Sequence, residues 1–325
     1  MPLTDEQTAQ AAQLFSTMRS EIAKAVIGQA EVIEQSLIAL AAGGHVLIEG
    51  VPGLGKTLLV CAIAKTFEGG FARIQFTPDL MPSDVTGHSV YDPGTGQFST
   101  RKGPVFTNLL LTDEINRAPA KTQAALLEVM QEAQVTIEGV AHALAQPFMV
   151  LATQNPVEQE GTYPLPEAQL DRFLLKIRIG YPTHADEVTM TRSVTIGKTG
   201  DKLAVDAVQT LLKPQTVRTL QQMTAMVDVS DEVLDYAVRI VRKTREFAGI
   251  SSGAGSRGCL ALVRAGRALA LMSSRNYVTP DDIKRVVPAC LRHRVRPAPE
   301  LEIEGRDSDS LLSALLEQVD RKSVV

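Results

Sequence analysis

The run Gly50-Val51-Pro52-Gly53-Leu54-Gly55-Lys56-Thr57 decides the fold, because it matches the phosphate-loop pattern G-x-x-x-x-G-K-[ST] at every fixed position. The glycines let successive backbone N–H groups turn toward a β-phosphate. Lys56 is placed to reach the β- and γ-phosphate oxygens, and Thr57 to offer its hydroxyl to Mg²⁺. The run therefore predicts a nucleotide site.

The residues on both sides of this run have the pattern that a phosphate loop needs. Val46-Leu47-Ile48 is a short apolar run of the kind found in buried parallel strands. Residues 58–64 are apolar over a length that favours a helix. The order strand, loop, helix makes an ordinary glycine-rich surface turn the weaker alternative.

A second strand, predicted over residues 105–112, ends in two carboxylates, Asp113 and Glu114. Open parallel sheets bind their ligands at the carboxyl ends of their strands. We therefore expect Asp113 to hold Mg²⁺ through its water shell and Glu114 to orient and activate the attacking water. An acidic pair after a strand is weak evidence alone, and it gains weight from the phosphate loop about 55 residues earlier.

A third polar side chain follows another apolar strand. Residues 148–153 are continuously apolar or small, and Gln154-Asn155-Pro156 comes next. At the carboxyl end of a neighbouring strand, Asn155 is placed to align the water. The alternative is that Asn155 only forms a turn before proline.

The segment between the phosphate loop and the acidic pair Asp113-Glu114 is predicted to be irregular. Prolines and glycines in residues 77–105 exclude a long uninterrupted helix and predict an insertion. Residues 88–91 and 97–100 form either a hairpin or an irregular loop. Residues 135–137 and 141–144 are a second candidate hairpin.

The chain changes character after Tyr181-Pro182, which is typical of a linker. Beyond it the apolar spacing is helical. Helices are predicted over 184–195, 215–227, 231–246, 258–273 and 281–287. We predict an α/β core over residues 1–181 and an α-helical domain with a C-terminal tail over residues 182–325.

Composition limits the classes of function. Of 325 residues, 44% are hydrophobic and 22% are charged, as in ordinary globular proteins. No apolar run approaches the roughly 18 residues of a membrane span. The N-terminal residues lack a secretory signal, so the expected location is cytoplasmic. A net charge of −4 argues against coating nucleic acid, so the partners are expected to be proteins.

Metal-binding and disulfide patterns are not visible. Three cysteines without C-x-x-C spacing favour small buried side chains, and the five histidines are scattered. A basic cluster near the end is interpreted as a solvated or interface edge, with a nucleic-acid patch as the minority alternative. Its members are Arg292, His293, Arg294 and Arg296.

Taken together, these residues resemble the AAA+ ATPases, a class of P-loop NTPases, over nearly the whole chain. The resemblance identifies Gly50 to Thr57 as Walker A, Leu109 to Glu114 as Walker B, Asn155 as sensor 1, Arg172 as the arginine finger and Arg257 as sensor 2. It implies catalytic roles for Glu114, Asn155, Arg172 and Arg257. It implies contacts to nucleotide from Gly50, Pro52, Gly53, Leu54, Gly55, Lys56, Thr57, Leu58 and Asp113, with Thr57 and Asp113 also at the metal.

Within that class, longer strings resemble the MoxR family. They are GHVLIEGVPG from Gly44, RIQFTPDLMPSD from Arg73, GPVF from Gly103 and DEINRAP from Asp113. The resemblance identifies residues 77–105 as a helix-2 insert and residues 134–147 as a pre-sensor hairpin. The family usually has proline between Ser256 and Arg257, and this chain lacks it, so the pose of Arg257 stays open. Because the insert of this clade can reposition the lid, it also stays open whether Arg257 touches nucleotide within its own subunit or across an interface.

The resemblance implies Mg²⁺-dependent ATP hydrolysis in a ring, expected to be a homo-hexamer, coupled to remodelling of a protein client. It also implies a chaperone-like role and a partner with a von Willebrand factor A domain. Two alternatives share the same core: a DNA-stimulated motor or clamp loader, and a magnesium-chelatase-like metal-insertion subunit. A module that holds nucleotide without turnover is the least favoured, because Glu114 and Arg172 are present.

Overall fold

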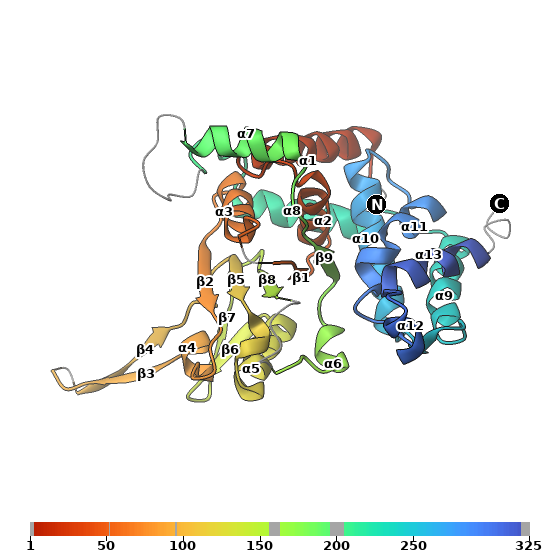
Figure 1. The fold of residues 1–325 in the computed structure, drawn as a ribbon. Coiled ribbons are helices and arrows are strands. Elements are labelled where there is room, and N and C mark those ends of the chain that lie inside the picture. Colours follow the sequence, from red (N-terminus) through yellow and green to blue (C-terminus); the bar gives the residue numbers. More distant parts are fainter. Residues whose placement is uncertain (1–2, 52, 95, 156–162, 196–204, 320–325) are drawn as a thin grey trace.

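A five-stranded parallel sheet forms the centre of the first part of the chain (Figure 1). The computed structural model describes residues 3–51, 53–94, 96–155, 163–195 and 205–319. The strand order is β2-β5-β8-β1-β9, and all four neighbouring pairs are parallel. The strands are β1 Val46–Glu49, β2 Phe71–Gln75, β5 Leu109–Asp113, β8 Met149–Gln154 and β9 Leu175–Arg178. The parallel α/β core predicted from the sequence is confirmed.

The central strands are apolar up to their carboxyl ends because both faces of the sheet are covered. Successive side chains of a strand point to opposite faces. Leu109 and Leu111 accordingly pack into the core with helices α1, α2 and α3, whereas Leu110 packs into the core on the other side with α5. The helices of this part are α1 Asp5–Ala25, α2 Ala30–Ala41, α3 Lys56–Thr66, α4 Pro82–Thr86, α5 Ala120–Glu132 and α6 Glu167–Leu170.

The strand predicted to begin at residue 105 begins only at Leu109. Its neighbour β2 begins at Phe71, which pairs with Leu109, so earlier residues have no strand to pair with. The backbone N–H groups of Asn108 and Leu109 donate instead to the carbonyl oxygen of Gly70. The predicted start at residue 105 was wrong because the end of a strand depends on where its partner strand begins, and a local sequence pattern does not reveal that.

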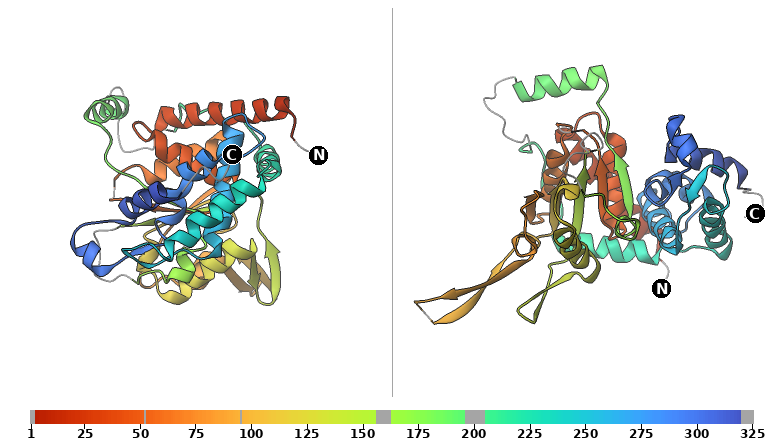
Figure 2. Two further views of the ribbon diagram at one scale, coloured as in Figure 1. Left: turned by 90° about the vertical axis from the view of Figure 1, so that its right-hand side faces the viewer. Right: turned by 60° about the horizontal axis from the view of Figure 1, so that its bottom comes forward.

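Both candidate hairpins are present. Strand β3 (Gly87–Asp92) pairs antiparallel with β4 (Gln97–Lys102), and β6 (Gln134–Ile137) pairs with β7 (Val140–Ala143). The β3–β4 hairpin extends far from the sheet, as Figure 1 and the right-hand view of Figure 2 show. The short helix α4, which the sequence patterns do not predict, precedes it. The hairpin alternative for residues 77–105 is therefore confirmed over the irregular loop.

The rest of the chain is mostly helical. The five predicted helices are present, and α12 and α13 follow them. Their bounds are α7 His184–Thr195, α8 Pro214–Met226, α9 Asp231–Thr244, α10 Ser256–Met272, α11 Pro280–Leu291, α12 Pro299–Ile303 and α13 Ser308–Gln318. A two-stranded antiparallel pair, β10 (Ile250–Ser252) and β11 (Arg296–Pro297), joins the turns between them. The division at residues 181 and 182 stays a prediction.

The helical part packs against the sheet edge formed by β9 and against α2 (Figure 1). The Gln221 amide in α8 donates to the Leu40 carbonyl, 2.8 Å away. The Arg264 guanidinium in α10 donates to the Ala42 carbonyl at 2.7 Å and to the Gly43 carbonyl at 3.0 Å. These carbonyls end α2 and lead into β1, so the two helices are fixed beside the amino end of β1.

Among the residues that the structure describes, no helix combines the length and apolar character of a membrane span. Within the same ranges, no three His, Cys, Asp or Glu side chains gather as a metal cluster.

His45, directly before β1, is a half-buried histidine held in its neutral form. The backbone N–H of Val150 donates to Nδ1 at 3.0 Å, and Nε2 lies 3.0 Å from the Met130 carbonyl oxygen, so we assign the proton to Nε2. Burial is the main cause that lowers the pKa of His45, to about 4, and the positive charge of Arg264 acts in the same direction. The Met130 contact opposes the shift.

This pKa predicts a loss of stability in acid. In the unfolded chain His45 becomes protonated below about pH 6.5. In the folded chain it stays neutral until about pH 4. The stabilisation is complete above pH 6.5, and we expect about 3 kcal/mol to be lost as the pH falls to 4. Urea unfolding of wild type and His45→Gln across this range measures the difference. Parallel pH profiles for the two proteins would contradict the assignment.

Candidate functional site

The phosphate loop joins the carboxyl end of β1 to the first turn of α3. Gly53 and Gly55 have φ values of 85° and 77°, where residues other than glycine are strained. A Cβ added at either position meets no heavy atom within 4 Å, so the space around them is open. The helix begins at Lys56, which directs the free N–H groups of its first turn at the loop. This cradle fits a phosphate.

Gly50 is required for a steric reason that the motif does not reveal. A Cβ at this position lies 2.3 Å from Cγ2 of Ile179 and 2.6 Å from the Ile179 carbonyl oxygen. Gly50 therefore lets the chain after β9 cross directly over the start of the loop. Pro52, another predicted contact, lies outside the described residues.

The Lys56 ammonium donates to the carbonyl oxygen of Gly50. Burial lowers the pKa of Lys56, and the charges of Asp113 and Glu114 oppose that shift. Thr57 and Leu58 follow in the same turn of α3, with Leu58 packed against the main core. Leu54 packs against that core from the loop itself. Leu54 and Leu58 thus anchor the loop to the core, and the Lys56 ammonium is held at the start of the loop.

Asp113 is the last residue of β5 and is buried. Arg73 Nε donates to one of its carboxylate oxygens at 2.7 Å, and the Thr153 hydroxyl donates to the other at 3.2 Å. The same hydroxyl accepts the backbone N–H of Glu114 at 3.0 Å. Glu114 has a left-handed backbone, with φ 56°. Thr153 thus fixes the turn in which the two acidic residues lie.

The Glu114 carboxylate is held by two donors. Gln75 Nε2 lies 2.7 Å from its Oε2, and Arg117 Nε lies 3.2 Å from the same oxygen. Neither Arg73 nor Gln75 was predicted as a site residue. A signal was present, because they occupy alternate positions of a strand and so share a face. Their position beside Asp113 depends on β2 pairing with β5, which only the fold reveals.

Asn155 follows β8, which lies between β1 and β5 in the sheet, and it is buried. Lys56, Asp113, Glu114 and Asn155 therefore come from the carboxyl ends of three adjacent strands. The predicted water-aligning position of Asn155 agrees with this placement, and its role stays a prediction.

Arg172 lies at the amino ends of the strands, opposite to the carboxyl ends that carry the phosphate loop. It precedes β9, and the backbone N–H of Leu174 donates to the carbonyl of His45 at the amino end of β1. The four residues of β1, about 13 Å of strand, separate this edge from the phosphate loop. The Arg172 guanidinium donates to the Leu127 carbonyl in α5, at 2.6 Å. Arg172 is not close to the phosphate loop of its own chain.

Arg257 lies near Arg172 and not near the loop. It is in the first turn of α10, its side chain is half exposed, and its Nε lies 4.0 Å from a carboxylate oxygen of Asp171. Arg172 and Arg257 line one hollow together with Gly43 and Gly44. The two predicted arginines are thus brought together, apart from the other predicted residues.

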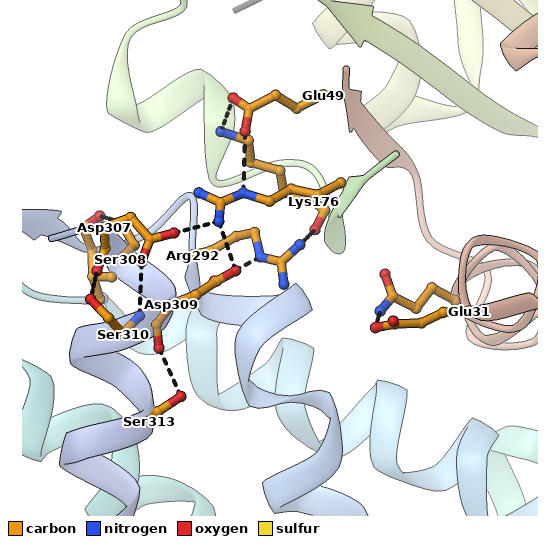
Figure 3. A network of polar contacts seen from close by, with 12 residues as sticks. Glu31, Glu49, Lys176, Arg292, Asp307, Ser308, Asp309, Ser310 and Ser313 are labelled. Carbon is orange, nitrogen blue, oxygen red and sulfur yellow. Dashed lines mark hydrogen bonds and ion pairs between the residues drawn. The ribbon is translucent and has the colours of Figure 1, made fainter. Parts of the chain in front are cut away.

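A chain of ion pairs links the phosphate loop to the helical part (Figure 3). Glu49, the residue before Gly50, accepts from Lys176 Nζ at 2.6 Å and pairs with Arg178 at 3.4 Å. Arg178 pairs with Asp309 at 2.9 Å, and Asp309 accepts from Arg292 Nε at 3.0 Å. Residues of β1, β9, α13 and the end of α11 therefore form one continuous polar contact.

Residues 45–175 match the model of the ATPase family associated with various cellular activities (AAA), and residues 242–314 match the AAA lid domain. The chain is 44% identical to Chaperone MoxR1 of Mycobacterium tuberculosis over 85% of this chain and 74% of that protein. It is 32% identical to Protein MoxR of Methylorubrum extorquens, over 92% of each chain.

A crystal structure of a proposed ATPase from Cytophaga hutchinsonii superimposes with a TM-score of 0.89, at 42% identity and over 97% of both chains. Magnesium-chelatase subunits are less similar: ChlI-1 of Arabidopsis thaliana is 28% identical over 74% of this chain and 53% of its own length. The P-loop, the sheet order, the lid and these similarities agree. This chain belongs to the MoxR family of AAA+ ATPases.

Proposed function

We propose that this protein hydrolyses ATP with Mg²⁺ at sites shared between neighbouring copies in a ring. The observation that carries the proposal is the separation of the two groups of polar residues. Lys56, Asp113 and Glu114 lie at the carboxyl edge of the sheet, and Arg172 and Arg257 lie at the amino edge. Both groups serve one triphosphate only if the arginines belong to the next copy.

Each of the site residues has a defined task in this proposal. The loop N–H groups and Lys56 bind the phosphates, and Thr57 and Asp113 supply the oxygen ligands that Mg²⁺ prefers. Bound Mg²⁺ neutralises charge on the phosphate oxygens. Glu114 orients the water and accepts its proton, while Arg172 of the neighbour offsets the charge of the transferred phosphoryl group.

We further propose that hydrolysis drives remodelling of a bound protein, with the ring a homo-hexamer and a von Willebrand factor A domain protein as a partner. The similarity to a protein named as a chaperone supports a protein client. The ion-pair chain from Glu49 to α13 offers a physical path from the loop to the helical lid. A cytoplasmic location belongs to the same proposal.

The test begins with purified protein. We expect ATP turnover that requires Mg²⁺ and an assembly whose mass, measured by light scattering, is a multiple of the 35.1 kDa chain. Single- and double-stranded DNA are added in parallel, and strong stimulation by either would favour the motor alternative instead. Capture on Glu114→Gln protein with ATP, compared with the same protein without ATP, then isolates the client.

A further inference from the structure

Arg294 is a buried arginine of the lid that contacts the segment carrying Arg172. It lies in the turn after α11, and its side chain is 3% exposed. Its Nε donates to a carboxylate oxygen of Asp171 at 2.7 Å. Its two terminal nitrogens donate to backbone carbonyls of the same segment: Asp171 at 3.1 Å, Phe173 at 2.6 Å and Leu174 at 3.2 Å.

This contact set differs from that of a surface salt bridge. One guanidinium bonds to a carboxylate and to three backbone carbonyls within residues 171–174, and one of its nitrogens also donates to the Cys290 carbonyl in the last turn of α11. Charge-assisted bonds of this kind are strong when buried, and a planar guanidinium satisfies several acceptors at once. The sequence pattern grouped Arg294 with a solvated or interface edge, which is wrong for this side chain, because the β9 edge and the lid cover it. Arg296, by contrast, is exposed.

The geometry fixes the backbone on both sides of Arg172. Asp171 is held before it and Phe173 and Leu174 after it, and Nε2 of His293 lies 3.1 Å from the Phe173 carbonyl. Among the residues that the structure describes, the Arg172 side chain bonds only through Nη1, to the Leu127 carbonyl, and its buried Nε has no hydrogen-bond partner. The direction in which Arg172 points therefore depends on its backbone, and Arg294 sets that backbone.

We propose that Arg294 is a positioning residue for Arg172: the lid holds residues 171–174 through Arg294 so that Arg172 is presented toward the neighbouring copy. This inference rests on the shared site proposed above. The turn after α11 would then have two roles. Arg292 joins it to the ion-pair chain that reaches Glu49, and Arg294 positions Arg172, which acts on the nucleotide of the next subunit.

Arg292 provides a matched control two residues away. Its side chain is 9% exposed, it also bridges lid and sheet, and it donates to Asp309 at 3.0 Å and to the Lys176 carbonyl at 3.2 Å (Figure 3). It makes no hydrogen bond to residues 171–174 among those that the structure describes. A general weakening of lid packing should affect both variants, whereas loss of Arg172 positioning should affect only Arg294.

The decisive experiment is a double-mutant cycle on kcat. Arg294→Gln is expected to lower kcat about tenfold or more in the wild-type background, because a misplacement of about 1 Å is costly in catalysis. In the Arg172→Ala background it is expected to lower kcat by less than about twofold, because residues that act through one another are not additive. Affinity for a fluorescent ATP analogue should stay within about twofold throughout, since the phosphate loop is untouched.

If Arg294→Gln does not fold, Arg294→Lys and Asp171→Asn replace it in the double-mutant cycle with Arg172→Ala. Lysine keeps the charge but replaces the planar fork, so an intermediate loss of kcat is expected in the wild-type background and none in the Arg172→Ala background. Arg292→Gln should not reproduce this dependence on Arg172. An equal fold-loss from Arg294 variants in both backgrounds overturns the positioning role.

The two proposals fail in different ways. If Arg172→Ala lowers turnover about 10³-fold and regains it on mixing with Lys56→Ala subunits, while Arg294 variants lower the residual kcat equally in both backgrounds, the shared site stands and the positioning role falls. If Arg172→Ala leaves turnover intact, the shared site falls and the positioning role falls with it.

Discussion

Mixing Arg172→Ala subunits with Lys56→Ala subunits is expected to restore ATP turnover that neither variant shows alone. Alone, each variant ring lacks one half of every site. In a random 1:1 ring, about a quarter of the sites combine an intact loop from one variant with an intact arginine from the other. Loss of the arginine is expected to lower kcat by about 10³-fold or more, so even partial recovery is easily measured.

This result follows from the positions of the two residues. Arg172 lies at the amino edge of the sheet and the loop at the carboxyl edge, so no single copy joins them. The measurement is turnover against mixing ratio at constant total protein. Arg239→Ala, which removes a surface pair with Asp235 in α9, is the control and should keep wild-type turnover. Absence of recovery, in rings shown by size to be mixed, would refute the shared site.

The same mixing assay settles the side on which Arg257 acts. Its Nε lies 4.0 Å from Asp171, the residue before Arg172, and both arginines line the same hollow. Arg257→Ala subunits should therefore also regain turnover with Lys56→Ala subunits. An arginine acting within its own subunit would instead give no recovery with that partner.

Glu114→Gln is expected to bind ATP like wild type and to lose nearly all turnover. The amide keeps the size of the side chain and its bond to Gln75, but it accepts no proton from water. We expect kcat to fall about 10²- to 10⁴-fold, which is the usual contribution of a general base. Single-turnover hydrolysis and equilibrium binding of a fluorescent ATP analogue measure the two effects separately.

A companion variant separates the roles of the two adjacent carboxylates. Asp113→Asn removes a charge from the oxygen pair predicted to hold Mg²⁺, so its defect should include a higher Mg²⁺ requirement for nucleotide binding. Glu114→Gln should show a wild-type Mg²⁺ requirement. Full turnover by the Glu114 variant, or identical Mg²⁺ behaviour of both variants, would be inconsistent with this division of tasks.

The sequence predicted well those features that are properties of a short run of residues. The glycines at 53 and 55 specify a left-handed backbone locally, and apolar runs at 46–48 and 148–153 read as buried strands without knowledge of their neighbours. The prediction was poorer wherever a residue's state depends on a partner far along the chain. β5 starts at Leu109 because β2 starts opposite it, and α13 is held by packing against α9 and α11.

By itself, the sequence determined the order of the strands along the chain, the phosphate loop, the acidic pair after β5 and the family to which the chain is similar. Only the tertiary structure decided that Arg73 and Gln75 hold those acids, that Arg294 is buried against residues 171–174, and that Arg172 and Arg257 lie away from their own loop. The physical reason is that a motif encodes local backbone geometry, whereas strand pairing and lid docking determine which distant side chains meet.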